Sequence, residues 1–324
     1  MQLVPNDANL NELSHDDSFY RIVLYLFWSE AKNKAHKVWC KFVDDLIHKN
    51  RFSSDSDIVI ELYNKAELAT YEIPQGTILY RARIYNGDLL SDFAKGFVKS
   101  KKSVKSNDSM SLDLDPVQVL PLAMVADPER GFDHIQNAYR KWRRKKFKGY
   151  NKKQSSAPPK EHASTGRANP EYISYLYLCE DTETPIYEVH PTIGQDISIA
   201  RLKTNRPLKL YDLTLSLPDH FEAPIYDAPS LYDIIGKYFS TPNTGNAIQY
   251  LPTQYLSEVI KKMGFDGLRF NSSLHQGGKN IVLFDPNSCD VISSDIVKVE
   301  NIEIKTCRPD IYYLDNMSSS MLDI

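Results

Sequence analysis

The first part of the chain, residues 16–71, has apolar side chains at every third or fourth position, the spacing of one buried helix face. Three helices are predicted, over residues 16–28, 34–48 and 55–68, with Asp17 and Ser18 as N-cap residues of the first. Their apolar positions are Phe19, Val23, Leu26 and Phe27, then Val38, Phe42, Val43 and Leu46, then Ile58, Leu62 and Leu68. Residues 1–72 are therefore interpreted as a small all-α N-terminal domain.

After a turn sequence at residues 73–76 (Ile-Pro-Gln-Gly), the pattern changes to apolar strands and short helices. Strands are predicted at residues 77–80, 173–178, 197–202, 208–213, 267–270 and 280–284. Helices are predicted at residues 133–148, 231–239 and 253–263. Residues 99–115 are rich in Ser, Lys and Asp and are interpreted as a surface loop. The predicted fold class is α+β, with a second domain over residues 73–324.

Composition narrows the function classes only a little. The chain has 324 residues and a formal net charge of -3, which gives no global attraction to nucleic acid or to an anionic membrane. The cysteines are scattered without a CxxC pair, so reduced thiols are expected rather than disulfides or a metal site. The apolar run at residues 22–28 is too short to span a bilayer, and the polar start does not resemble a signal peptide. A cytoplasmic protein without membrane contact is expected.

A basic segment at residues 139–153 could bind nucleic acid phosphates. Its cations surround Trp142 and Phe147, and they are Arg140, Lys141, Arg143, Arg144, Lys145, Lys146 and Lys148. A solvated helix face is the favoured interpretation, because the acidic remainder of the chain more than cancels this charge. Nucleic-acid binding through residues 139–153 is kept as the alternative function.

The most informative residues lie in and after an irregular loop at residues 166–170 (Gly-Arg-Ala-Asn-Pro). The guanidinium of Arg167 can fork onto phosphate oxygens, and the phenol of Tyr177 can stack on a flat ring. Glu188 is an isolated carboxylate among apolar neighbours, suited to stabilising positive charge on a sugar carbon. An Arg–Glu pair that only braces the loop is the structural alternative. No GxGxxG after a strand, Walker loop, nucleophile elbow or HExxH occurs.

Five segments, in order, resemble the RES-domain family, which is named for its Arg, Glu and Ser. They lie at residues 79–83 (Leu-Tyr-Arg-Ala-Arg), 155–159 (Ser-Ser-Ala-Pro-Pro), 166–170, 266–273 (Asp-Gly-Leu-Arg-Phe-Asn-Ser-Ser) and 280–284 (Asn-Ile-Val-Leu-Phe). The matching residues are Arg81, Glu188 and Ser272 for the three named motifs, with Arg167 and Tyr177 for the second arginine and the tyrosine. The resemblance covers residues 73–300.

The resemblance implies an ADP-ribosyltransferase-like mixed sheet and a toxin-type enzyme that breaks the nicotinamide–ribose bond of NAD. NAD is then the substrate, and no metal is implied. Glu188 would stabilise the ribose cation. The other implied contacts to NAD are Arg81 and Arg167 on the diphosphate, Tyr177 on a flat face, Ser272 on the ribose or amide, and Arg83 and Ser273 as further candidates. Ser272 is preferred over Ser273 because it has the family's aromatic-x-Ser spacing.

Several alternatives stay open on the sequence. The acceptor of ADP-ribose could be water, phosphate or a target protein, so a hydrolase, a phosphorylase and an ADP-ribosyltransferase are all compatible. The resemblance also implies a toxin or antiphage defence effector paired with an antitoxin or regulatory protein. The added helices could form an inhibitory cover, a sensor or a dimerisation unit, and a homodimer is the preferred arrangement.

Overall fold

The computed structural model describes residues 18–51, 56–87, 128–214, 230–242 and 247–303. The helices are α1 (Ser18–His48), α2 (Asp57–Lys65), α5 (Pro128–Arg143), α6 (Lys152–Ser155), α7 (Thr184–Glu188), α8 (Leu231–Ser240) and α9 (Leu251–Lys262). The strands are β1 (Thr70–Ile73), β2 (Ile78–Ile84), β3 (Leu176–Cys179), β4 (Asp196–Thr204), β5 (Leu208–Asp212), β6 (Gly267–Asn271), β7 (Lys279–Leu283) and β8 (Cys289–Lys298). No helix in these ranges is long and apolar enough to cross a membrane.

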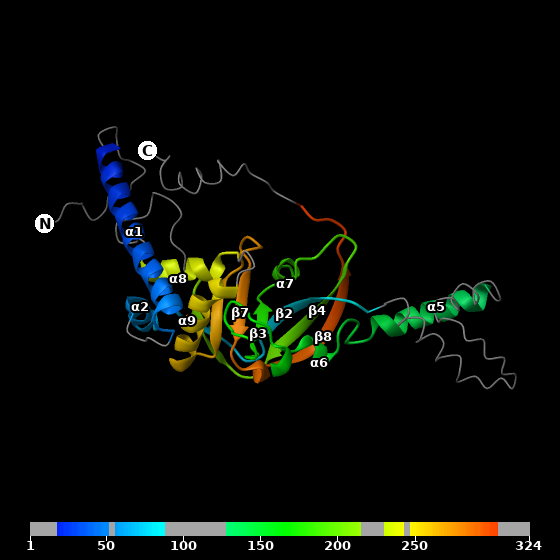
Figure 1. Cartoon of the computed structure of the whole chain (residues 1–324). Coiled ribbons are helices and arrows are strands. Elements are labelled where there is room, and N and C mark those ends of the chain that lie inside the picture. Colours follow the sequence, from blue (N-terminus) through cyan, green and yellow to red (C-terminus); the bar gives the residue numbers. More distant parts are fainter. Residues whose placement is uncertain (1–17, 52–55, 88–127, 215–229, 243–246, 304–324) are drawn as a thin grey trace.

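The strands form one mixed sheet in the order β1-β5-β6-β7-β3-β2-β4-β8 (Figure 1). The β5–β6 pair is parallel and the other pairs are antiparallel. The predicted α+β class with a mixed sheet is therefore confirmed. In the middle of the sheet, β2 and β3 are paired at a single position, Tyr80 opposite Cys179. Residues of both strands next to this position line one pocket between the two halves of the sheet.

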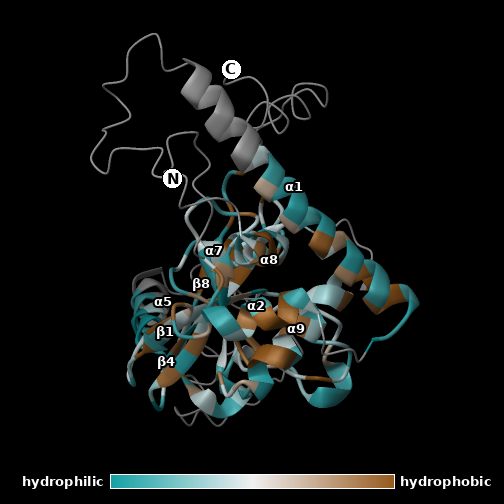
Figure 2. Cartoon of the chain, turned by 90° about the vertical axis from the view of Figure 1, so that its left-hand side faces the viewer, coloured by the Kyte–Doolittle hydropathy of each residue, from teal (hydrophilic) through white to brown (hydrophobic). Residues whose placement is uncertain are grey.

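The N-terminal helices pack on the sheet domain and share its core. Trp39 of α1 stacks on Tyr238 of α8, with ring centroids 4.3 Å apart. Ile58 and Leu62 of α2 are fully buried in the same cluster as Phe239 of α8. Figure 2 shows apolar positions on α2 and α9 where these helices lie together. The predicted boundary at residue 72 falls inside β1, which pairs with β5. The division into domains at residues 1–72 and 73–324 stays a prediction.

Several predicted elements need correction. The break predicted between residues 28 and 34 is wrong, because α1 is continuous from Ser18 to His48. The predicted helix at 133–148 is wrong beyond Arg143, because α5 ends there and Phe147 forms a β-bridge with Ser294 of β8. The strands β1 and β8 and the helices α6 and α7 were not predicted. The predicted loop at 99–115 and the apolar side chains of the first predicted helix, Phe19, Val23, Leu26 and Phe27, lie outside what the structure describes.

The basic segment is exposed but only partly helical. All charged side chains between Arg140 and Lys146 are exposed to solvent. Helix α5 projects away from the sheet on the side of β4 and β8 (Figure 1). Lys148 instead turns back to the sheet and pairs with Asp295 at 2.5 Å. The exposure of these cations agrees with the preferred interpretation as a solvated face. Nucleic-acid binding by this segment stays the alternative prediction.

Candidate active site

A cavity of about 350 Å³ opens where β2 and β3 separate. Its walls include Tyr80, Arg81, Gly166, Arg167, Tyr177, Cys179, Glu188, Phe239, Tyr250, Phe270, Asn271, Ser273 and Asn280. Five of the seven predicted site residues line it: Arg81, Arg167, Tyr177, Glu188 and Ser273. Arg83 and Ser272 do not line it and act from behind the wall. The cavity thus combines two guanidinium groups, one carboxylate and several flat aromatic faces, which suit an anionic ligand with a planar ring.

Glu188 is the last residue of the short helix α7. Pro185 lies in its first turn, and the carboxylate of Asp181 accepts the backbone N–H groups of Glu183 and Thr184 at 2.8 and 2.7 Å. At the other end, the carboxylate oxygen Oε1 of Glu188 accepts two hydrogen bonds of 2.7 Å each, from the Ser272 hydroxyl and the Asn280 amide. No described residue donates to Oε2. The carboxylate is therefore fixed by one oxygen, and its second oxygen is left for a ligand.

The two serines have different positions. The hydroxyl of Ser272 donates to Glu188 and accepts the backbone N–H groups of Leu274 and His275, both at 3.1 Å. It is therefore fully engaged within the protein, while Ser273 lines the cavity. This geometry gives Ser272 a role in holding Glu188 and leaves Ser273 as the serine facing a ligand.

Tyr177 anchors the loop at residues 166–170. Its hydroxyl donates to Asn169 Oδ1 at 2.6 Å and accepts the backbone N–H of Ala168 at 3.1 Å. The Asn169 amide in turn donates to the carbonyls of Ser164, Pro170 and Ile173. Burial raises the pKa of Tyr177 far above neutral, and the nearby Arg167 cation offsets only a small part of this. The phenol therefore stays protonated and serves as a fixed donor.

Arg167 emerges from this anchored loop into the cavity. Its Nη1 donates to the carbonyl of Tyr238 at 3.0 Å, and its guanidinium lies 5.8 Å from the centre of the Tyr250 ring. Burial lowers the pKa of Arg167, while Tyr250 and the Glu188 carboxylate act in the opposite direction. No described carboxylate forms an ion pair with it. The cation thus remains available for an anionic ligand.

Arg81 and Arg83 hold the segment that follows α6. Both donate to the carbonyl of Ser156, and Arg81 lies 3.5 Å from the carbonyl of Ser155. Burial, followed by repulsion from Arg83, lowers the pKa of Arg81 to about 9, so it is still a cation at neutral pH. Within the described residues neither arginine has a carboxylate partner. Arg81 reaches the cavity wall, whereas Arg83 braces the segment behind it.

A family model of the RES domain matches residues 135–304, more than half of the chain. The chain belongs to the RES-domain family. The match includes Arg167, Tyr177, Glu188 and both candidate serines, but it begins after Arg81 and Arg83. Those two arginines nonetheless stand on β2, between β3 and β4 of the same sheet.

Among solved structures, the chain is similar to one described as the crystal structure of the M. tuberculosis MbcT–MbcA toxin–antitoxin complex. The sequence identity is 12%, the TM-score is 0.35, and the alignment covers 73% of this chain and 92% of the other. A likeness of this size carries no argument about function. No curated protein matches the sequence.

Sequence reasoning missed one residue that contacts Glu188 in this RES domain. Asn280 was named as the first residue of a predicted strand and of one family-like segment, without a role at the site, yet its side chain donates to Glu188. The available signal was an amide at a strand position followed by Ile281, Val282 and Leu283, because a buried amide is costly unless it is hydrogen-bonded. Its partner could not be identified, because Glu188 lies 92 positions away in the sequence.

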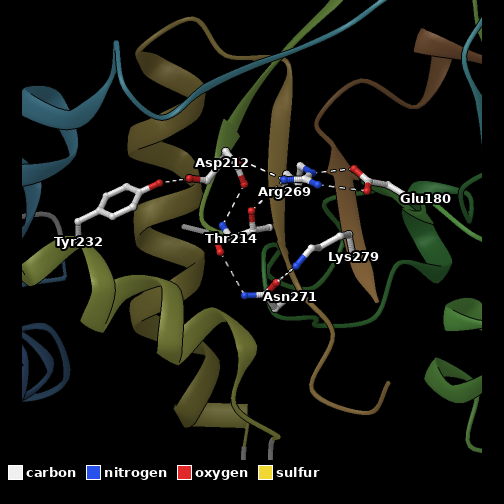
Figure 3. Close-up of polar contacts among 7 residues, drawn as sticks. All are labelled: Glu180, Asp212, Thr214, Tyr232, Arg269, Asn271 and Lys279. Atoms are coloured by element: carbon white, nitrogen blue, oxygen red, sulfur yellow. Dashed lines mark hydrogen bonds and ion pairs between the residues drawn. The ribbon is translucent and has the colours of Figure 1, made fainter. Parts of the chain in front are cut away.

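A second polar network lies beside the cavity (Figure 3). Arg269 donates to Glu180 at 2.6 and 3.2 Å and to Asp212 at 3.0 Å. Burial alone would lower the pKa of Arg269, but these carboxylates raise it above its usual value. Lys279 donates to Asn271, which also lines the cavity. Since its charges are balanced within the network, we interpret it as a brace between strand ends. Within the described ranges no cluster of His, Cys, Asp and Glu could hold a metal.

Tyr177→Phe separates anchoring from ring stacking. The ring is kept, but the N–H of Ala168 loses its acceptor, so we expect unfolding free energy to fall by about 1–3 kcal/mol. If the substrate is NAD, as the family resemblance implies, its KM should rise as the Arg167 loop loosens, with the alkaline side of the pH–rate profile unchanged, because the phenol does not titrate there. Thermal denaturation and steady-state kinetics measure both effects. Unchanged stability with a large fall in kcat would contradict the anchoring role.

Proposed function

We propose that this RES domain cleaves the nicotinamide–ribose bond of NAD. The observation that carries the proposal is the Glu188 carboxylate, held through one oxygen at the wall of a cavity that also contains two guanidinium groups, Arg81 and Arg167, which have no carboxylate partner among the described residues. NAD combines the complementary features, namely a diphosphate, flat rings and a cationic leaving group. The family match supports the same activity through the resemblance of its motifs.

In the proposed reaction, the bond between ribose C1 and the nicotinamide nitrogen breaks, and its electron pair goes to that nitrogen. Neutral nicotinamide leaves, and positive charge develops on C1 and the ribose ring oxygen. The free oxygen of Glu188 would stabilise this charge or hold a ribose hydroxyl that does. Arg167 and Arg81 would bind the diphosphate, and the aromatic walls would contact the rings. An acceptor then adds to C1 through a lone pair and loses a proton.

Water or phosphate is our proposed acceptor, which makes the protein an NAD glycohydrolase or phosphorylase. Transfer to a target protein is the alternative outcome of the same cleavage. Incubating the purified chain with NAD in buffer, with added phosphate, and with a bacterial lysate distinguishes the three. The products would be ADP-ribose, ADP-ribose phosphate and ADP-ribosylated protein respectively. No nicotinamide release in any of these mixtures would contradict the proposal.

We further propose that the cleavage is toxic and that NAD is consumed in the cytoplasm of the producing cell. Induced expression in a bacterium is expected to arrest growth as cellular NAD falls. An antitoxin or other regulatory protein would then be needed to restrain it. The RES-domain membership supports this proposal. Growth at the normal rate with active enzyme and depleted NAD would argue against a toxin.

Arg167→Ala is expected to raise KM for NAD by at least about tenfold, since it removes a charge-assisted contact to the diphosphate of about 1.5–3 kcal/mol. Arg167→Lys should restore little, because a point charge cannot reproduce the bidentate fork. Calorimetric titration with NAD measures the affinity directly. Lys237→Ala, a cation on the exposed side of α8, serves as the control. Unchanged affinity in Arg167→Ala would exclude the diphosphate role.

A further inference from the structure

Asn280 has an amide in a place where an apolar side chain would be expected. It lies on β7, opposite Cys179 on β3 and Phe270 on β6, and only 8% of it is exposed. It also lines the cavity. Both ends of its amide are satisfied: Nδ2 donates to Glu188 Oε1 at 2.7 Å, and Oδ1 accepts from the Cys179 thiol at 3.2 Å. A buried amide with these partners is costly to replace.

The two partners together fix which way the amide faces. A carboxylate can only accept a hydrogen bond, so it selects the NH₂ end of the amide. A protonated thiol donates, so it selects the carbonyl end. Burial, followed by the charge of Glu188, raises the pKa of Cys179 well above neutral, so the thiol remains protonated and keeps its donor role. In the reverse orientation, the amide oxygen would face the carboxylate and both bonds would be lost.

We infer that Asn280, oriented by Cys179, is a positioning residue for Glu188. Together with Ser272 it occupies Oε1, so that Oε2 is the oxygen presented to the ribose cation. This inference rests on the proposed function, because it explains how the carboxylate assigned to that function is held in position. Cys179 belongs to the site through this contact and has no nucleophilic role, since a protonated buried thiol is a poor nucleophile.

The first test is Asn280→Asp, which keeps the shape of the side chain and replaces the donor by a second carboxylate. Two adjacent carboxylates oppose each other's ionisation, so the acidic limb of the pH–rate profile should move to higher pH. The other titratable or charged groups acting on this region are Arg167, Cys179, Glu180 and Asp181, and all are retained in the variant. We expect kcat at pH 7 to fall on the order of 100-fold, with KM within about threefold, because misplacement affects the chemical step.

Three further variants complete the test. Asn205→Asp makes the same chemical change at an exposed position outside the cavity and should leave the kinetics unchanged. Cys179→Ala should lower kcat, because the amide loses the donor that orients it, whereas Cys179→Ser keeps a donor and should recover most of the activity. Wild-type kcat and an unmoved pH profile in Asn280→Asp would overturn the inference.

A readout independent of turnover separates this inference from the proposed function. A crystal structure of Asn280→Ala should show the Glu188 carboxylate displaced from its wild-type position, because one of the two donors to Oε1 is lost. An unmoved carboxylate would overturn the inference even in an active enzyme. A displaced carboxylate in a protein that does not cleave NAD would uphold the positioning and reject the proposed function instead.

Discussion

Replacing Glu188 by glutamine is expected to lower kcat for nicotinamide release by about 100- to 1,000-fold, with little change in stability. Glutamine has the same shape, and its carbonyl oxygen can accept the hydrogen bonds that Ser272 and Asn280 donate to Oε1. The substitution therefore removes the negative charge while it keeps the packing and these contacts. This fall corresponds to about 2.7–4 kcal/mol of transition-state stabilisation, the effect of one fixed group on a developing charge. Single-turnover kinetics with NAD and thermal denaturation measure the two quantities.

The matched control is Glu183→Gln, the same chemical change just before α7 on a side chain that is 74% exposed. Its only ion pair is a long one, with His275 at 3.8 Å, in the part of the chain that the structure describes. We expect near wild-type turnover from this control. If Glu188→Gln were equally active, Glu188 could not be the group that stabilises the ribose cation, although NAD cleavage by other residues would remain open.

The sheet was largely predictable because its inner strands are nearly continuous apolar runs. The predicted strands at 197–202 and 280–284 correspond to β4 and β7, both of which lie inside the sheet with other strands on each side. Such strands show their burial directly in the sequence. β8 lies at the sheet edge, where exposed and buried positions alternate irregularly and polar residues are frequent, so its pattern resembles a loop.

The chemistry of the site was more predictable than its geometry. An arginine in an irregular loop and a lone carboxylate among apolar residues are visible without a structure, as Arg167 and Glu188 show. The sequence contains no signal that Ser272 faces the carboxylate instead of a ligand, because the contact depends on how the 272–278 turn meets α7. The single β2–β3 pairing that opens the cavity is likewise a long-range property of the sheet.

Removing residues 1–68, which leaves β1 intact, is expected to make the protein insoluble. Trp39 and Phe42 of α1, with Ile58 and Leu62 of α2, are buried against residues of α8 and α9 in one cluster. Their removal would expose the apolar faces of α8 and α9 to water, at about 25 cal/mol per Å² of exposed surface. The soluble fraction after expression measures the outcome. An inhibitory cover predicts the opposite, namely a soluble fragment with higher NAD cleavage or toxicity than the full chain.

Two isoleucines on α2 provide a gentler test of the same packing. Ile58 is fully buried and Ile60 is 54% exposed, so the same change to alanine should have different effects at these positions. We expect Ile58→Ala to reduce the free energy of unfolding by about 2–5 kcal/mol, and Ile60→Ala by under about 1 kcal/mol. Because the cluster joins α2 to α8, the loss should lower a single cooperative transition that also ends NAD cleavage. A separate early transition that leaves cleavage intact would instead show that residues 1–72 fold as an independent domain.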